Sequence, residues 1–91
     1  MKAYIVVIEA STARGYETKV GETGHTEIET AKIELVEKMN AIKADPKPCF
    51  GHVCKDGIHT EWITDRYLVL KHALYDDLVN IYIHEINIPE P

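Results

Sequence analysis

The residues most able to do chemistry are concentrated in residues 49–63, which hold both cysteines, two of the five histidines and the only tryptophan. Two alternating segments flank Asp56-Gly57 within this stretch. An Asp-Gly pair in that context is typical of a type I′ turn, which needs positive φ at both central residues. We therefore predict a β-hairpin over 49–63 that turns at Asp56-Gly57.

Pairing across this turn would bring candidate metal ligands together. Cys54 would lie opposite His59 and His52 opposite Glu61, with all four side chains on one face of the hairpin. Zinc accepts these ligand types, but structural zinc sites usually use short cysteine knuckles that curl round the ion. A flat two-stranded surface spreads its side chains instead. We therefore predict ordinary cross-strand polar pairs and no metal or cofactor, with a small-ligand or metal-binding module on this face as the alternative.

A catalytic role for these side chains lacks the surroundings that it would need. Cys54 with His59 as base could form a nucleophilic pair, but the sequence has no strand-to-helix elbow that would supply oxyanion donors. Residues 21–24 contain two glycines, yet they include an acid and lack the lysine of a phosphate-binding loop. We expect a protein that is not an enzyme.

Composition and charge narrow the class of protein further. The 91 residues predict a single domain, 1–91, and 45% hydrophobic with 27% charged residues is ordinary for a globular chain. A net charge of −5 with ten scattered basic residues disfavours direct nucleic-acid binding. The longest apolar run, Tyr4–Ile8, is too short to span a membrane, and no signal peptide is recognisable. We expect a cytoplasmic protein with reduced thiols.

The first half of the chain predicts two strands and one helix. Residues 3–10 are apolar on both parities, as in a central strand covered on both faces, and residues 16–20 alternate weakly, as in a short edge strand. A helical period begins after Thr26 and predicts a helix over about 27–43, with a capping box formed by Thr26 and Glu29. The apolar stripe of this helix consists of Ile28, Ala31, Leu35, Val36, Met39 and Ile42.

The second half predicts another hairpin. Residues 66–75 and 78–88 alternate, with Asp76-Asp77 as the turn. A helix over residues 65–76 is the competing interpretation, but charged residues would interrupt its apolar arc. The predicted fold is therefore α+β, a mainly antiparallel sheet of five to six strands with one amphipathic helix packed on one face.

The loop between the two hairpins decides which side chains are buried, because a one-residue change of register moves every side chain to the other face. A three-residue loop, 64–66, places Trp62 with the apolar core residues, whereas a two-residue loop would bury histidines and an acid without partners. The three-residue loop predicts an outer sheet face formed by Phe50, His52, His59, Glu61, Tyr67, Tyr75, Tyr82 and His84.

This aromatic and histidine surface is the basis for predicting function. Exposed aromatic side chains with few lysines are typical of protein-binding hot spots. We expect a small acidic protein-binding module that regulates or inhibits a larger protein, a class that includes phage-encoded inhibitors of host defence systems. The exposed sheet face could also form a homodimer. A third interpretation, an acidic mimic of DNA, is weakened because Lys32, Lys38 and Lys43 interrupt the acidic helix.

Overall fold

A computed structural model of the protein describes residues 1–11, 17–50, 56–73 and 78–89. The described residues form β1 (Lys2–Ser11), β2 (Glu17–His25), α1 (Ile28–Ala44), α2 (Lys47–Phe50), β3 (Ile58–Thr64), β4 (Tyr67–His72) and β5 (Leu78–Asn87). No helix within these ranges is long and apolar enough to cross a membrane.

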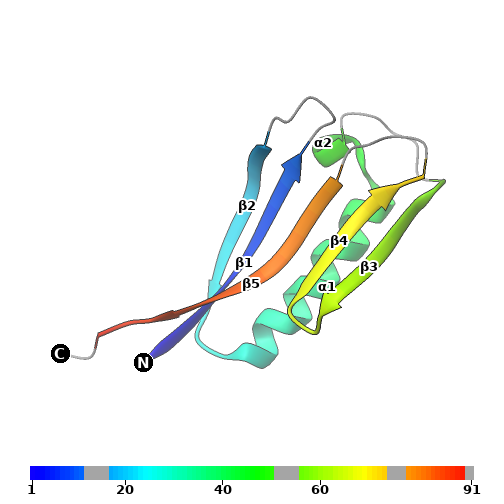
Figure 1. The fold of residues 1–91 in the computed structure, drawn as a ribbon. Helices are drawn as coiled ribbons and strands as arrows, with labels where there is room; N and C mark the ends of the chain where they lie inside the picture. The colour runs from blue at the N-terminus through cyan, green and yellow to red at the C-terminus, as the bar shows by residue number, and fades with distance from the viewer. Residues whose placement is uncertain (12–16, 51–55, 74–77, 90–91) are drawn as a thin grey trace.

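The strands form one antiparallel sheet of five, in the order β2-β1-β5-β4-β3. Figure 1 shows α1 lying across one face of this sheet, and none of the described helices covers the other face. β1 is an inner strand, as predicted, because β2 and β5 flank it. The α+β architecture predicted from the sequence is confirmed.

Helix α1 packs on the sheet through the predicted apolar stripe. Ala31, Leu35 and Ile42 are buried, and Met39 packs against the same cluster. Val36, which the sequence placed at the margin of the stripe, is 40% exposed. The buried stripe is therefore narrower than predicted, and one edge of α1 keeps apolar side chains in contact with solvent.

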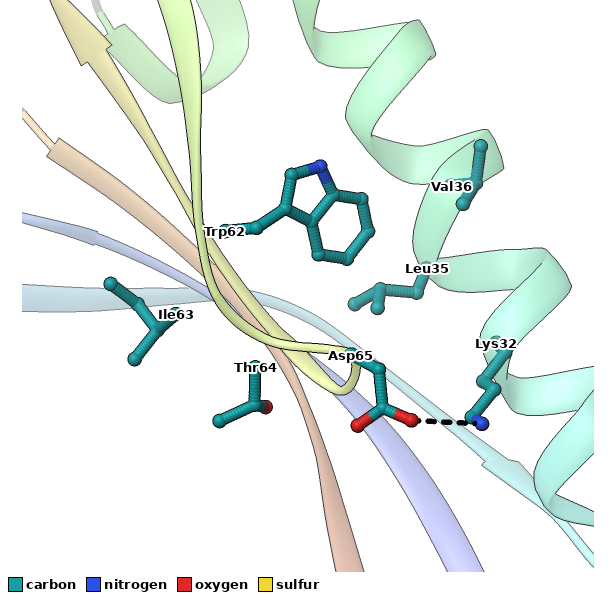
Figure 2. Close-up of a pocket in the computed structure, with 7 residues that line it drawn as sticks. All are labelled: Lys32, Leu35, Val36, Trp62, Ile63, Thr64 and Asp65. Atoms are coloured by element: carbon teal, nitrogen blue, oxygen red, sulfur yellow. Dashed lines mark ion pairs between the residues drawn. The ribbon is translucent and has the colours of Figure 1, made fainter.

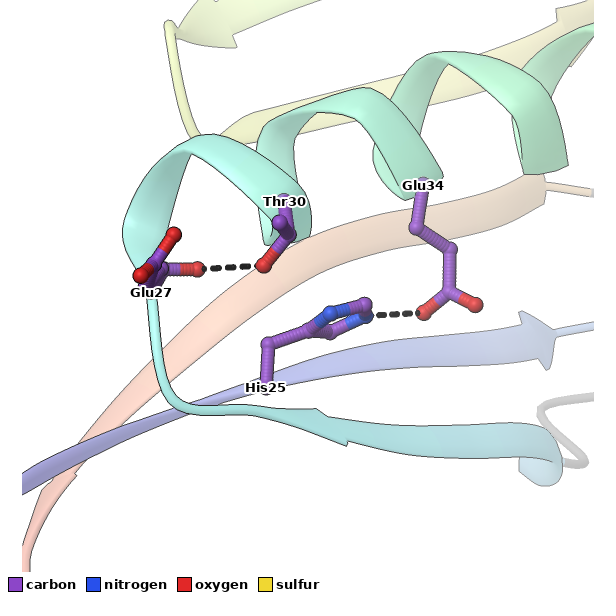
Figure 3. Close-up of polar contacts among 4 residues, drawn as sticks. All are labelled: His25, Glu27, Thr30 and Glu34. Carbon is purple, nitrogen blue, oxygen red and sulfur yellow. Dashed lines mark hydrogen bonds and ion pairs between the residues drawn. The ribbon is translucent and has the colours of Figure 1, made fainter.

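The predicted capping box at the start of α1 is wrong. The capping residue is Glu27, which is extended, and no side chain bonds to the first backbone donors. With Glu27 at the cap, the third helical position is occupied by Thr30, whose hydroxyl donates to the carbonyl of Glu27 at 2.9 Å (Figure 3). A box between Thr26 and Glu29 would require the helix to begin one residue earlier.

The first residues of the predicted 49–63 hairpin are helical. In α2, the backbone amides of Cys49 and Phe50 both donate to the carbonyl of Pro46, at 3.1 and 2.8 Å. Pro46 immediately precedes the first helical residue, Lys47, and its carbonyl accepts the first bonds of the helix. Its missing amide proton costs nothing there, because the first amides of a helix have no partner within the helix. Phe50 belongs to the buried core and is 5% exposed. Its assignment to a strand and to the outer face is therefore wrong.

Asp56-Gly57 forms a turn, but the turn is not type I′. Gly57 has a φ of 92°, whereas no described non-glycine residue, Asp56 included, has a positive φ. The strand that follows, β3, pairs with β4. Residues 51–55, which would complete the other arm of the predicted hairpin, lie outside the described residues.

The hairpin predicted for the second half of the chain is confirmed. β4 and β5 pair in antiparallel register with Leu68 opposite Ile81, and the competing helix over 65–76 does not form. The leucine and isoleucine side chains share one face, as their alternation predicts. The proposed turn, Asp76-Asp77, lies outside the described residues.

Strand β2 is longer than the sequence predicts, because it continues through Gly21 and Gly24 to His25. Glycine lowers strand propensity, but pairing with a neighbouring strand overrides that preference. Gly21 lies opposite Ile8 in β1, whose side chain would come within 3.7 Å of an added Cβ. That distance is an ordinary van der Waals contact, so the packing against Ile8 does not require glycine at this position.

The hydrophobic core lies between α1 and the sheet face that α1 covers. Residues from four elements contribute its largest fully buried apolar side chains: Leu35 from α1, Leu68 and Leu70 from β4, Ile81 and Val79 from β5, and Val6 from β1. Phe50 of α2 joins the same cluster. One continuous core therefore links both halves of the chain.

Replacing Gly57 with alanine is expected to lower the free energy of unfolding by about 1 to 2 kcal/mol. Its φ of +92° is unfavourable for other residues, and an added Cβ would lie 3.3 Å from Cε1 of His72. Gly24→Ala is the matched control, because nothing lies within 4 Å of its added Cβ. Urea unfolding of both variants would measure the difference, and equal losses would contradict the special role of Gly57.

Candidate protein-binding site

The register between β3 and β4 determines which face each candidate residue occupies. Trp62 lies opposite Leu68, which is the register that the predicted loop required. The three-residue loop itself is wrong, because Thr64 belongs to β3 and pairs with Tyr67, so the turn is Asp65-Arg66 and a register shift between Trp62 and Thr64 takes up the extra residue. Because Leu68 is fully buried in the core under α1, Trp62 is on the helix side of the sheet. His59 and Glu61 alternate with Trp62 and therefore point to the opposite side.

We call that opposite side the uncovered face. Cross-strand pairing aligns its side chains: Tyr82 lies opposite Tyr67 on one side and opposite Val7 on the other. All five strands contribute to the face. Its residues are Ile5, Val7 and Glu9 from β1, Glu22 from β2, Leu78, Asn80, Tyr82 and His84 from β5, Tyr67, Val69 and Lys71 from β4, and His59 and Glu61 from β3.

The uncovered face collects the predicted binding residues that can be placed, with one exception. His59 and Glu61 are exposed, Tyr67 and Tyr82 are half-buried, and His84 is exposed. Phe50 is the exception, because it is buried in the core. The remaining members of the predicted surface, His52 and Tyr75, lie outside the described residues.

Two tyrosines form the centre of the uncovered face. The rings of Tyr67 and Tyr82 stack with their centroids 5.6 Å apart and an interplanar angle of 15°. The Tyr67 hydroxyl donates to Oδ1 of Asn80 at 3.0 Å, and the Tyr82 hydroxyl donates to Oε1 of Glu9 at 2.7 Å. Both rings are therefore held in place before any partner arrives, which reduces the conformational entropy lost on binding.

Small apolar residues lie beneath these longer side chains. Val7 and Val69 belong to the uncovered face, yet they are only 5% and 7% exposed. Val7 is opposite Tyr82, and Val69 is opposite both Asn80 and Glu61. The sequence predicted that residues 3–10 are covered on both faces. On this side the cover comes from neighbouring side chains, and none of the described elements forms a second layer there.

The phenol of Tyr82 is expected to ionise at unusually high pH. Its hydrogen bond to Glu9 and its partial burial raise the pKa from 10.0 to about 12. The folded state therefore holds this proton where the unfolded chain has lost it, so the stabilisation is complete below pH 10 and is lost as the pH rises through 12. Ultraviolet titration of Glu9→Gln should show ionisation at lower pH, and an unchanged titration would contradict the assigned cause.

The charged side chains near the tyrosines are paired. Lys71 forms an ion pair with Glu61 across β3 and β4. The hydrogen bond and charge of Lys71 lower the pKa of the exposed Glu61 carboxyl. The pair places a fixed negative and positive charge beside His59, which is opposite Lys71 in the register. This edge of the uncovered face is therefore suited to polar contacts around an aromatic centre.

The described residues do not bring together a metal site. Within them, no group of three His, Cys, Asp or Glu side chains could hold an ion. Two of the four candidate ligands, His59 and Glu61, are on the uncovered face, while His52 and Cys54 lie outside the described residues. Cys49 is a free, half-buried thiol, and burial raises its pKa, which makes the reactive thiolate scarcer.

The sequence did not predict a groove on the other side of the sheet, between α1 and the end of β3 (Figure 2). The groove has a volume of about 510 Å³ and is lined by Lys32, Leu35, Val36, Trp62, Ile63, Thr64 and Asp65. Lys32 and Asp65 form an ion pair of 3.1 Å at one end. Trp62 is 48% exposed and Ile63 55% exposed. The sequence did contain a signal for an exposed apolar surface here. Trp62 and Ile63 are consecutive apolar residues of one strand, so their side chains point to opposite faces and cannot both lie in the core.

A second feature that the sequence did not predict joins β2 to α1. Nε2 of His25 and Oε1 of Glu34 are 2.8 Å apart, and both side chains are largely buried (Figure 3). His25 is the last residue of β2, and Glu34 is on the side of α1 that faces this strand. The contact holds the start of α1 over the edge of the sheet.

Comparison with known proteins does not assign the chain to a family. No protein-family model, curated protein or solved structure matches it. The candidate site is therefore defined by the geometry of the uncovered face alone.

Proposed function

We propose that the protein is a small acidic protein-binding module whose uncovered face docks on a larger protein and regulates or inhibits it. The observation that carries the proposal is the preorganised pair of Tyr67 and Tyr82 at the centre of a sheet face that no described helix covers. Inhibitors of this kind include phage-encoded proteins that act on host defence systems. We place the interaction in the cytoplasm.

The arrangement of the face supports protein binding over other functions. Its centre is aromatic and rests on the buried Val7 and Val69, while its margin carries His59, His84 and the Lys71–Glu61 pair. An aromatic centre with a polar margin is typical of protein interfaces, in which a few central side chains supply most of the affinity. The net charge of −5 favours a partner with a basic surface.

Affinity capture with matched variants tests this proposal. Tagged protein would be incubated with lysate of the source cells, and captured proteins would be compared between the wild type and a double variant, Glu61→Ala with His84→Ala. These two exposed residues lie on the uncovered face, so their loss should weaken capture without disturbing the core. Glu29→Ala with Glu37→Ala, two exposed changes on α1, is the control.

The proposal predicts at least one protein that the wild type and the α1 control capture but the face variant retains poorly. Capture that is equal in all three proteins, or that is lost only in the α1 control, would contradict binding through the uncovered face. Circular dichroism of each variant would establish that the fold is intact before the comparison is made.

A further inference from the structure

We infer that the protein self-associates through the outer edge of β3, forming a two-fold dimer in which β3 pairs antiparallel with β3 of a second copy about Thr60. This interface uses the edge of the sheet and meets the uncovered face only at His59 and Glu61, so it leaves the two central tyrosines free and does not depend on the proposed function. The inference rests on the direction of the backbone groups, on the side chains of β3 and on the register that they allow.

The backbone hydrogen bonds of β3 and β4 show which groups point outward. The amide of Ala73 donates to the carbonyl of Gly57 at 2.9 Å, so these two residues form a hydrogen-bonded pair. Hydrogen-bonded and non-hydrogen-bonded pairs alternate along an antiparallel ladder. His59 and Glu61 therefore bond to β4, while the N–H and C=O groups of Ile58, Thr60 and Trp62 point to the outer edge of β3.

A hydrogen bond between β5 and the start of β4 supports the same alternation of inward and outward backbone groups. The amide of Ile83 donates to the carbonyl of Arg66 at 2.9 Å. Alternation from Arg66 then directs the backbone of Leu68 and Leu70 toward β5, leaving the residues between them to bond to β3. No described strand pairs with the outer edge of β3, so the donors and acceptors of residues 58, 60 and 62 have no ladder partner among the described strands.

The two edge strands of the sheet, β2 and β3, differ in the features that discourage pairing with a further strand. Sheet edges are commonly protected by bulges, proline and charged side chains, above all lysine. The β2 edge has a register shift against Ile8 and Glu9, and glycines at 21 and 24 lower its strand propensity. The segment 58–62 of β3 has regular register and contains no proline or lysine, and its one charged residue, Glu61, is paired with Lys71 of β4. It is therefore the edge more open to an additional strand.

Only one register lets two copies of β3 fit each other well. A two-fold axis normal to the sheet keeps each face on its own side, so only pairings with a residue at the axis are allowed. With Thr60 at the axis, Ile58 lies opposite Trp62 of the second copy, and His59 lies opposite its Glu61. An axis at Glu61 would place two carboxylates together, and an axis at His59 would place two imidazoles together. The contact between imidazole and carboxylate and the contact between apolar side chains therefore both favour Thr60.

The Thr60 register also satisfies the outward backbone groups. Ile58, Thr60 and Trp62 each enter a hydrogen-bonded pair of the new ladder, because these residues carry the outward N–H and C=O groups. The indole of Trp62, 48% exposed in the single chain, gains apolar cover on the helix side. A ladder this short buries less area than a standard stable interface, so we expect a dissociation constant in the micromolar range.

Analytical ultracentrifugation from low micromolar to near-millimolar protein tests the inference. We expect a reversible increase toward twice the chain mass of 10.3 kDa. Thr60→Pro should weaken association by about tenfold or more, because it removes an outward donor at the axis. Proline is tolerated on an edge strand where the amide faces solvent, so circular dichroism should show a folded variant. A wild type that is monomeric throughout, or a folded Thr60→Pro that associates equally well, would overturn the inference.

A cysteine cross-link tests the register and does not depend on the proline variant. Paired Cα atoms at a hydrogen-bonded site are about 5.5 Å apart, within the range that a disulfide spans. Under mild oxidation, Thr60→Cys should form a dimer whose linkage peptide mapping assigns to residue 60 in both copies. Thr64→Cys, exposed and beyond the regular segment, is the control. Equal dimer yields from the two variants, or linkage only through the native cysteines, would overturn the register.

Discussion

Replacing Leu35 with alanine is expected to lower the free energy of unfolding by about 3 kcal/mol. Leu35 is 1% exposed and lies in the cluster that joins α1 to β1, β4 and β5. Its removal loses the transfer free energy of the side chain and leaves a cavity that the surrounding strands can fill only in part. A loss of this size is a large share of the roughly 5 to 15 kcal/mol that stabilises a typical domain.

Urea unfolding followed by circular dichroism would measure this loss. Ile33→Ala is the matched control, because Ile33 is in the same helix and 60% exposed. The control should change stability by less than about 0.5 kcal/mol. If the two substitutions proved equally costly, the assignment of the buried side of α1 would be wrong.

Removing either central tyrosine is expected to weaken binding of the captured partner strongly. Tyr82→Ala should raise the dissociation constant by about 30-fold or more, the loss typical of a hot-spot residue. Two effects combine, because the variant loses the ring that stacks on Tyr67 and the hydroxyl that bonds Glu9. Tyr67→Ala should have a similar effect. Isothermal titration calorimetry with the purified partner would measure both.

A conservative change separates the ring from the hydroxyl. Tyr82→Phe keeps the stacked ring and loses only the bond to Glu9, so we expect a loss smaller than about tenfold. Val36→Ala, on the exposed margin of α1, should leave the affinity unchanged. If Val36→Ala weakened binding as much as Tyr82→Ala, the groove beside α1 and not the uncovered face would be the docking site.

Hydrophobic periodicity was enough to predict the elements that build the core. The strand over 3–10, the helix over 27–43 and the hairpin of β4 with β5 all follow from apolar spacing, because their buried faces repeat with the period of their secondary structure. The side of the sheet occupied by Trp62 also followed, since the alternative register would have buried polar groups. Its burial did not follow, because Trp62 was expected in the core and is 48% exposed.

Predictions made from local turn residues were wrong where contacts with distant parts of the chain determine the structure. Asp56-Gly57 favours a type I′ hairpin, yet only Gly57 has positive φ. The residues after Pro46 form α2, which places Phe50 in the core. Gly21 and Gly24 shortened the predicted second strand, although pairing with β1 extends it to His25. The composition of a short segment does not reveal which distant strand the segment will pair with.

Contacts between separate elements could not be predicted from spacing at all. The His25–Glu34 contact joins a strand end to a helix, and the groove at Trp62 is lined by residues of both α1 and the end of β3. The Tyr67–Tyr82 stack depends on the exact cross-strand register. The sequence predicted that these tyrosines share a face, whereas their geometry required the structure.

Hydroxyl-radical footprinting of the protein with and without its captured partner tests the central claim most directly, because side-chain oxidation reports which face the partner covers. The proposal predicts reduced oxidation at Tyr67, Tyr82 and His84 in the complex. Trp62, on the edge and helix side, should be oxidised as in the free protein. Protection of Trp62 with unchanged oxidation of the two tyrosines and His84 would contradict docking through the uncovered face.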